Sequence, residues 1–235
     1  ISPYDENKIY VCLQNGTWSE DIGKIYRSLD GGDTWADWTD GVSEYTKCLV
    51  IQPSNNGKDI VYFFTTSKNG YNSKVYSRVE GQPYWNPYDD NYPAGMSVNL
   101  ALPFYRDGKL RVAGNSGVWE SPMTESTFTP LINPWVEKSF YDCMEDTLYF
   151  DDHSILNHEG AVWEWEITPE PNYISNPNIR NPKVVLGNTG AYNVTLSVTQ
   201  NGETYVKTIS EMVSATTCPS VDDCNNPAEL NKGDW

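Results

Sequence analysis

Short stretches of alternating apolar and polar residues recur in pairs through the first half of the chain. An alternation with a period of two predicts β-strands that bury one face. The first members of the pairs are Ile9-Tyr10-Val11, Val61-Tyr62-Phe63 and Leu110-Arg111-Val112, and the second members are residues 25–28, 75–78 and 118–121. No long stretch has the helical period of 3.6, so we expect an all-β protein.

The three pairs form an internal repeat. Tyr26, Tyr76 and Trp119 occupy the same place in successive pairs and are separated by 50 and 43 residues. A spacing of about 40–50 residues is typical of four-stranded β-propeller blades. The repeat therefore predicts about three blades, ending near Trp135.

The turn after the first pair, residues 28–35, reads Ser-Leu-Asp-Gly-Gly-Asp-Thr-Trp. Asp30 is placed to accept hydrogen bonds from backbone amides just ahead of it, and the two glycines after it permit positive φ. Trp35 begins the returning strand, and we expect its ring to be buried between two sheets. The corresponding turns are less regular, since residues 77–85 are one residue longer and residues 121–128 lose the Asp and the Gly.

Strand, turn and strand with this pattern resemble the Asp box, or BNR repeat, of sialidases and sortilin-like β-propellers. The residues that carry the resemblance are Ser28, Asp30, Gly32, Thr34 and Trp35. In those families the box is a structural corner remote from the catalytic centre. The resemblance implies that residues 1–136 are a partial β-propeller, its C-terminal blades. Because propellers close with about four to eight blades, we expect chain upstream of Ile1 to complete it, and another subunit is the less simple alternative.

The second half of the chain has more closely spaced strands. They are predicted at residues 147–150, 161–167, 183–186, 192–198 and 205–209. Short, regularly spaced strands of this kind indicate a β-sandwich. Trp163 stands where an immunoglobulin-like fold has its core tryptophan, and Tyr192 where it has a corner tyrosine.

Residues 181–196 look like the second half of a PKD domain, an immunoglobulin-like β-sandwich. The sequence Trp-Glu-Trp-Glu-Ile at 163–167 stands where that family carries Trp-Asp-Phe-Gly-Asp-Gly, and departs from it after the second aromatic residue. The resemblance implies a PKD-type domain over residues 137–216. Residues 217–235 are then a polar linker toward a further module.

The chain is strongly acidic, with a formal net charge of −16 over 235 residues and a pI near 4.4. Nucleic acid and anionic membranes are disfavoured as partners because they need clustered Lys and Arg. No apolar run approaches the roughly 18 residues that span a bilayer, so we expect no direct membrane insertion. We interpret the carboxylates as a solvated surface and expect no cofactor; calcium bound by some of them is the alternative.

Five cysteines are present, and this odd number leaves at least one without a partner in the segment. Cys218 and Cys224 lie close enough in sequence to form a local disulfide, whereas Cys12, Cys48 and Cys143 have no such neighbour.

The most unusual loop is the aromatic run at residues 84–93. Trp85, Tyr88 and Tyr92 lie beside Asp89 and Asp90, a combination suited to stacking on sugar rings and bonding to hydroxyl groups. The alternative, which we favour, is a connection between blades whose rings pack inside the propeller.

Other candidate chemistry is weaker. A sialidase needs an arginine cluster, but we interpret Arg27 and Arg78, at one repeat position, as solvent-facing strand residues. His153 and His158 have no third well-placed ligand, so we predict no metal site. The segment has no recognisable catalytic constellation.

These features favour a non-catalytic segment of a large secreted or cell-surface bacterial protein, with a role in scaffolding, adhesion or glycan contact. Its partners would be a glycan or a protein of the cell surface or secretion machinery, and a type IX secretion cargo is a natural setting inferred from the resemblance. The alternative is the C-terminal part of a sialidase-like glycoside hydrolase whose active site lies on upstream blades.

Overall fold

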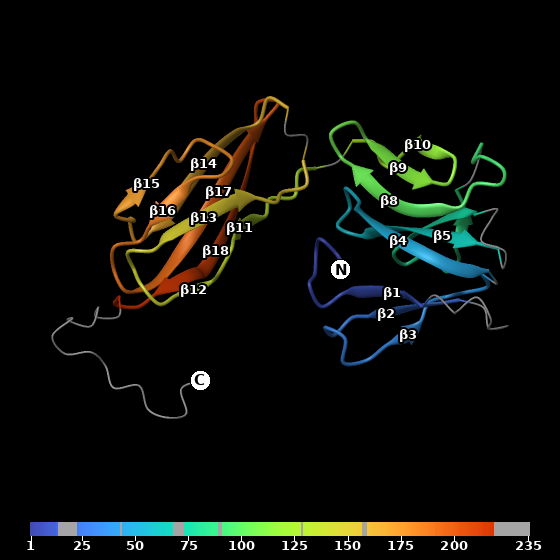
Figure 1. Ribbon diagram of the computed structural model, residues 1–235, viewed down its shortest axis with the longest axis horizontal. Helices are drawn as coiled ribbons and strands as arrows, with labels where there is room; N and C mark the ends of the chain where they lie inside the picture. The colour runs from blue at the N-terminus through green and yellow to red at the C-terminus, as the bar shows by residue number, and fades with distance from the viewer. Residues whose placement is uncertain are drawn as a thin grey trace. The chain divides into compact units, whose positions relative to one another are not determined.

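The computed structural model describes residues 1–13, 23–42, 44–67, 73–88, 91–127, 129–156 and 159–218. Within these ranges the protein is all-β, and no helix is long and apolar enough to cross a membrane. The chain divides into two compact units, residues 1–129 and residues 130–235, which Figure 1 colours from blue to green and from yellow to red.

The first unit contains three antiparallel sheets in chain order (Figure 1). The first sheet is β1 (Ile9–Leu13), β2 (Lys24–Ser28) and β3 (Ala36–Asp37); the second is β4 (Tyr45–Pro53), β5 (Asp59–Thr66), β6 (Val75–Val79) and β7 (Asn86–Pro87); the third is β8 (Val98–Phe104), β9 (Lys109–Gly114) and β10 (Gly117–Pro122). The predicted strand pairs are present as β1–β2, β5–β6 and β9–β10.

The second sheet is covered on both faces. Along β5, Ile60, Tyr62 and Phe64 belong to a cluster shared with the third sheet, whereas Val61 and Phe63 belong to a cluster shared with the first. All five side chains are at most 1% exposed. This double burial explains why β5 is an unbroken apolar run, since a strand with two dry faces has no position for an outward polar residue.

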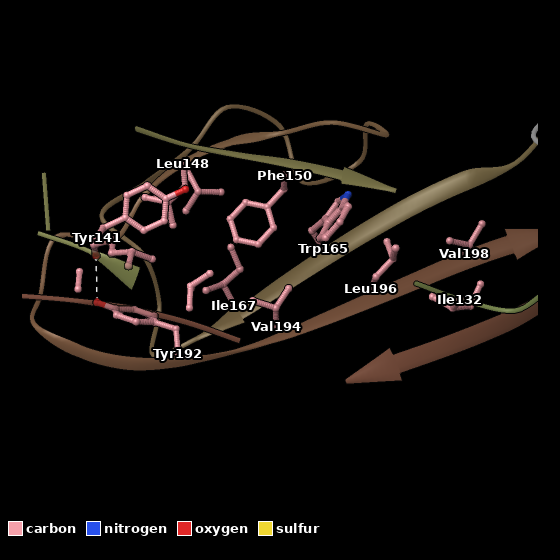
Figure 2. Packing of buried hydrophobic residues seen from close by; sticks show 14 of the residues in the cluster. Ile132, Tyr141, Leu148, Phe150, Trp165, Ile167, Tyr192, Val194, Leu196 and Val198 are labelled. Atoms are coloured by element: carbon pink, nitrogen blue, oxygen red, sulfur yellow. Dashed lines mark hydrogen bonds between the residues drawn. The ribbon is translucent and has the colours of Figure 1, made fainter. Parts of the chain in front are cut away.

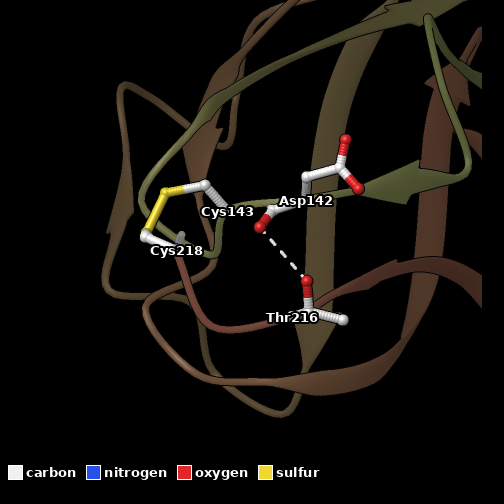
Figure 3. Close-up of a disulfide and its surroundings, with 4 residues drawn as sticks. All are labelled: Asp142, Cys143, Thr216 and Cys218. Atoms are coloured by element: carbon white, nitrogen blue, oxygen red, sulfur yellow. Dashed lines mark hydrogen bonds between the residues drawn. A yellow bond between two sulfur atoms is a disulfide. The ribbon is translucent and has the colours of Figure 1, made fainter. Parts of the chain in front are cut away.

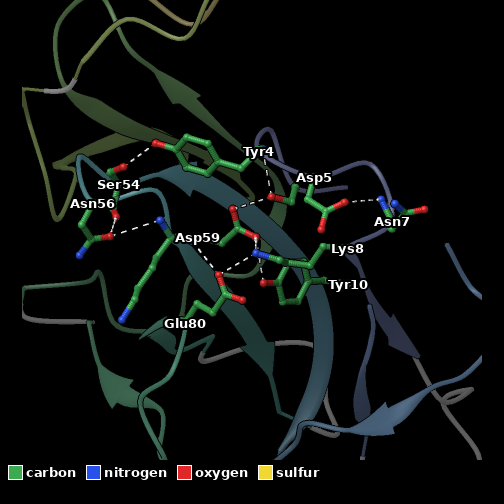
Figure 4. A network of polar contacts seen from close by, with 11 residues as sticks. Tyr4, Asp5, Asn7, Lys8, Tyr10, Ser54, Asn56, Asp59 and Glu80 are labelled. Carbon is green, nitrogen blue, oxygen red and sulfur yellow. Dashed lines mark hydrogen bonds and ion pairs between the residues drawn. The ribbon is translucent and has the colours of Figure 1, made fainter. Parts of the chain in front are cut away.

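A buried carboxylate fastens the N-terminal segment to β5 (Figure 4). Asp59 is fully buried and accepts hydrogen bonds from the Ser2 hydroxyl at 2.8 Å and the Tyr10 hydroxyl at 2.9 Å. The Lys8 ammonium lies 3.6 Å from Asp59 and 2.7 Å from Glu80. A buried charge is tolerated when it is paired and hydrogen-bonded, so this network joins the first sheet to the second.

Strand register shows which positions of the sheets correspond. Tyr26 pairs with Asp37 in the first sheet, and Tyr76 pairs with Pro87 in the second. Each of these pairs encloses its turn, with ten residues between the two partners. Residues 28–35 therefore align with residues 78–85 without an insertion. The two turns therefore have the same length, and the prediction that the second is one residue longer is wrong.

This alignment corrects two expectations. Trp35 corresponds to Trp85, but Trp35 is 43% exposed and lies on the outward face of the first sheet, whereas Trp85 is 7% exposed and lies between the first and second sheets. Arg78 occupies the place of Ser28 rather than of Arg27. Its guanidinium is buried 4.2 Å from the centre of the Trp38 ring, donates to the Trp38 carbonyl and pairs with Asp40, so Arg78 is not solvent-facing.

The second unit is a sandwich of two four-stranded sheets around one core (Figure 2). In sheet order, one sheet is β11 (Pro134–Val136), β13 (Thr147–Asp152), β16 (Lys183–Val185) and β15 (Tyr173–Ile174); the other is β12 (Phe140–Tyr141), β18 (Glu203–Ala215), β17 (Gly190–Gln200) and β14 (Val162–Thr168). Strand β11 pairs with β13, so residues 130–136, which include Trp135, belong to this unit and not to the preceding one.

The sequence predicts Trp163 and Tyr192 as aromatic residues of the sandwich core. In the structure a different tryptophan, Trp165, lies at the centre of that core. Trp165, only 3% exposed, packs edge-on against Phe150. Trp163 lies on the same face of β14 but is half-buried at the edge of the core, where its indole donates to Asp152. Trp165 rather than Trp163 is therefore the central tryptophan. Tyr192 is buried, and its hydroxyl contacts the carbonyls of Leu186 at 3.2 Å and Asn188 at 3.1 Å.

The disulfide joins Cys143 to Cys218 (Figure 3). The end of β18 runs beside the turn after β12, where the Thr216 amide donates to the Tyr141 carbonyl and the Met144 amide donates to the Thr216 carbonyl. This backbone pairing brings two cysteines together that are 75 residues apart. The expected bridge from Cys218 to Cys224 is thus replaced; Cys224 itself lies outside the described residues.

We expect a non-reducing digest of the chain to yield a peptide pair linked through Cys143 and Cys218. Replacing both by Ser should lower the free energy of unfolding of the sandwich by about 2–5 kcal/mol, because the bridge closes a long loop. Replacing Cys12 and Cys48, which are free thiols in the first unit, is the matched control and should leave the sandwich unchanged. A linked pair containing Cys218 and Cys224 would contradict the pairing.

Tyr192→Phe should destabilise the sandwich by about 1–2 kcal/mol, because it leaves ring packing intact and removes the hydroxyl contacts to two carbonyls. Tyr149→Phe is the matched control, since Tyr149 is half exposed, and should change stability by no more than about 0.5 kcal/mol. Denaturant unfolding of both variants checks this. Equal stabilities would show that the corner hydrogen bonds contribute nothing.

Candidate functional site

The turn that contains Asp30 is closed by its own side chains. Asp30 accepts hydrogen bonds from the Thr34 amide at 2.9 Å and the Thr34 hydroxyl at 2.5 Å, and Ser28 donates to it at 2.7 Å. The Gly32 amide donates to the Ser28 hydroxyl at 2.9 Å, and the Trp35 indole donates to the Gly32 carbonyl at 2.8 Å. Every polar side chain of the pattern is used within the turn, so the turn is a structural corner and offers no reactive group.

A cleft of about 240 Å³ lies between the second and third sheets. From the second sheet side it is lined by Phe64, Val75, Tyr88, Asn91, Tyr92 and Pro93, and from the third by Leu110, Val112, Trp119, Glu120, Ser121 and Pro122. Its walls are thus mostly apolar and aromatic, with a few polar groups. This composition is typical of small-molecule sites.

The equivalent space between the first and second sheets is filled by the Trp85 side chain. There the Trp85 ring lies 5.0 Å from Trp38 and 5.5 Å from Phe63, centre to centre. By strand register, Tyr88 is the counterpart of Trp38, and Val112 is the counterpart of Phe63. The third sheet has no fourth strand among its described residues, and none of those residues takes the place of Trp85. Counting from Trp119 as from Tyr76, the residue of the third repeat that corresponds to Trp85 is Phe128, which lies outside the described residues.

Four aromatic residues line the cleft: Phe64, Tyr88, Tyr92 and Trp119. Tyr88 packs edge-on against Tyr62 at 5.1 Å, and its hydroxyl donates to the Pro122 carbonyl, which fixes its ring. Trp119, 45% exposed, offers part of its indole face to the cleft. Tyr92 is partly buried; its hydroxyl oxygen has no access to solvent and no hydrogen-bond partner among the described residues.

The Tyr92 hydroxyl is the unusual group of the cleft. Buried polar groups are nearly always hydrogen-bonded, and an unpaired one points to a missing water or ligand. Burial raises the pKa of Tyr92 to about 12, so at neutral pH the hydroxyl is protonated and can both donate and accept. In the sequence Tyr92 is one ring of the aromatic run at residues 84–93, with no signal that separates it from its neighbours.

The structure divides the three rings for which glycan contact and packing between blades are the two alternatives. Tyr88 and Tyr92 line the cleft, whereas Trp85 is buried on the opposite face of the second sheet, where its indole donates to the Trp38 carbonyl at 3.1 Å. Trp85 therefore packs between sheets and is not available to a sugar. Trp119, which the sequence marked only as a repeat position, takes its place at the site. Asp89 and Asp90 lie outside the described residues.

The remaining candidates do not converge. Arg27 lies 5.4 Å from the Trp38 ring, and Arg78 is committed to Asp40. His153 stacks on Trp135 at 4.7 Å in the second unit, and His158 lies outside the described residues. In the part of the chain that the structure describes, no three His, Cys, Asp or Glu side chains are grouped to hold a metal ion.

Comparison with known proteins adds no relative. No model of a protein family matches the chain, and no curated protein matches it in sequence. Function must be argued from the geometry of the site.

We expect a carboxyl NMR titration to give Asp30 a pKa of about 2, well below the usual value of about 3.9 for Asp. The Thr34 hydroxyl and amide lower it by bonding to the charged form. Because the pKa is depressed in the folded state, the carboxylate stabilises the turn above about pH 4, and this stabilisation is lost as the pH falls through about 2. Thr34→Val should raise the pKa of Asp30 toward its usual value, and an unchanged pKa would contradict this role for the hydroxyl.

Proposed function

We propose that this chain is a non-catalytic segment of a secreted or cell-surface bacterial protein, which binds the terminal ring of a glycan in the cleft between the second and third sheets. In this proposal the first unit is three consecutive blades of an Asp-box β-propeller, and the second is a PKD-type sandwich. The observation that carries the proposal is the cleft lined by aromatic rings and a few polar groups.

The chemistry of the cleft suits a sugar. One face of a pyranose ring is apolar and stacks on an aromatic ring such as Trp119, while its edge carries hydroxyl groups. The Tyr92 hydroxyl has no access to solvent, so a sugar in the cleft would contact the Tyr92 ring rather than its hydroxyl. The volume of about 240 Å³ is below the ~300 Å³ at which sites for drug-sized ligands begin, which favours a single ring over an extended chain.

The charges of the cleft favour binding over hydrolysis. Glycoside hydrolases need two carboxyl groups about 5–10 Å apart on either side of the bond that breaks. Among the described residues that line the cleft, Glu120 is the one carboxylate, and it pairs with Lys109 and Arg111. These cations lower the pKa of Glu120, which is opposite to what a general acid requires.

The sandwich supports an exported setting. Disulfides such as Cys143–Cys218 persist in oxidising compartments and are rare in the cytosol. The acidic surface supports the same interpretation because it opposes adsorption to nucleic acid.

A glycan array with the 235-residue chain, followed by calorimetry on the best ligand, tests the proposal. Trp119→Ala should weaken binding about tenfold or more, because it removes the stacking surface. Tyr92→Phe should leave binding nearly unchanged, because the hydroxyl has no access to the solvent-filled cleft, and should leave the melting temperature unchanged or higher, because the hydroxyl has no partner among the described residues. Affinity should change little with salt, since stacking does not depend on charge.

Trp135→Ala is the matched control, because Trp135 is a partly exposed tryptophan of the other unit, and it should leave binding unchanged. Absence of binding to every glycan on the array would contradict the glycan site. Hydrolysis of a glycoside by the purified chain would contradict the non-catalytic role.

A further inference from the structure

The cleft between the second and third sheets has no positively charged side chain among the residues that the structure describes. Its lining includes no Lys, Arg or His; it has the uncharged polar side chains Asn91 and Ser121, and Glu120 is the one charged residue that borders it. The two residues between Tyr88 and Asn91 in the sequence are both Asp, so that gap in the lining supplies no cation either. A negatively charged group in the cleft would therefore find no counter-charge among these residues.

The charged side chains of the third sheet lie on its other face. Arg111 pairs with Glu120 in the strand register, and the next pair along the strands is Val112 with Trp119. Successive side chains of a strand point to opposite faces, and Val112 and Trp119 line the cleft. The Arg111 and Glu120 side chains therefore point away from it, and the Arg111 guanidinium lies 4.3 Å from the centre of the Phe104 ring.

These outward cations are also neutralised where they lie. Glu120 pairs with the Lys109 ammonium and, at 3.3 Å, with the Arg111 guanidinium. Arg111 pairs with Asp107 as well. Two cations and two carboxylates balance in this cluster, which leaves no net positive charge beside the cleft.

The charge of the whole chain acts in the same direction. A formal net charge of −16 repels an anion that approaches the protein. An ion that leaves water without gaining a partner pays a large desolvation cost. An uncharged ring pays no such cost and keeps its stacking contact with Trp119.

We propose that the cleft selects uncharged sugar rings and rejects rings that carry a carboxylate, such as sialic acids and uronic acids. The inference rests on the proposed glycan site and narrows its ligand to one chemical class. The ring stacks on Trp119 and exchanges hydrogen bonds with neutral groups such as Asn91 and Ser121. No ion pair holds it.

Ligand-observed NMR titrations of the 235-residue chain with matched rings test this inference. The pairs are galactose with galacturonic acid, glucose with glucuronic acid and mannose with mannuronic acid. The members of a pair differ only at C6, where a carboxylate replaces a hydroxymethyl group. In the pair that the cleft accepts, the neutral ring should bind about tenfold more tightly or better at low salt. Added salt should narrow this difference by screening the repulsion of the acidic ring.

Ser121→Lys supplies the missing cation. Ser121 pairs with Leu110 and lies on the same face of its strand as Trp119, so the new ammonium should reach the cleft. It should raise the affinity for the acidic ring several-fold and change that for the neutral ring little. Ser210→Lys is the matched control, because Ser210 is an exposed serine of the sandwich, and it should leave both affinities unchanged.

Circular dichroism melting curves establish that both variants are folded. An acidic ring that binds as tightly as its neutral partner, or a Ser121→Lys variant with an unchanged preference, would overturn selection by charge while leaving the cleft as a glycan site. Failure of every ring to bind would contradict the glycan site itself, and this inference with it.

Discussion

The requirement that both faces of β5 be covered organises the first unit. Five consecutive residues, from Ile60 to Phe64, are apolar and buried, and their alternation sends three side chains to the third sheet and two to the first. Each fully buried residue of this size contributes roughly 1.5–3 kcal/mol, which only a neighbouring sheet on either side can supply. The buried Asp59 network lies at the start of the same strand and fixes the N-terminal segment against it. Sheets one and three are thus held by the sheet between them.

Much of this architecture could be predicted from the sequence because it depends on local pattern. The period-two alternation predicted the strand pairs of the first unit. The spacing of Tyr26, Tyr76 and Trp119 predicted which strands of successive pairs are equivalent. The acceptor role of Asp30 followed from the chemistry of a tight turn, and it is present as the bond from the Thr34 amide. The sandwich followed from strand spacing, and the buried Tyr192 from the place that a corner tyrosine has in an immunoglobulin-like fold.

The predictions for Trp35, Arg78 and Cys218 were wrong for a different physical reason. The environment of each of these residues is set by residues that are distant in the chain. Trp35 and Trp85 stand at equivalent positions, and only the presence of an adjacent sheet makes one exposed and the other buried. Arg78 looks like a solvent-facing strand residue until Trp38 and Asp40, about 40 residues away in the chain, supply a ring and a carboxylate. Cys218 has its nearest cysteine in sequence at Cys224, but the backbone pairing at the end of β18 brings it to Cys143. Sequence proximity carries no information on such contacts.

The same dependence on neighbours accounts for the candidate site. Between the first and second sheets the Trp85 indole fills the space beside Trp38 and Phe63. Between the second and third sheets the counterparts of those residues, Tyr88 and Val112, line a cleft instead. The same pattern of apolar strand positions thus gives a packed interface on one side of the second sheet and, among the described residues, a cleft lined by aromatic rings on the other.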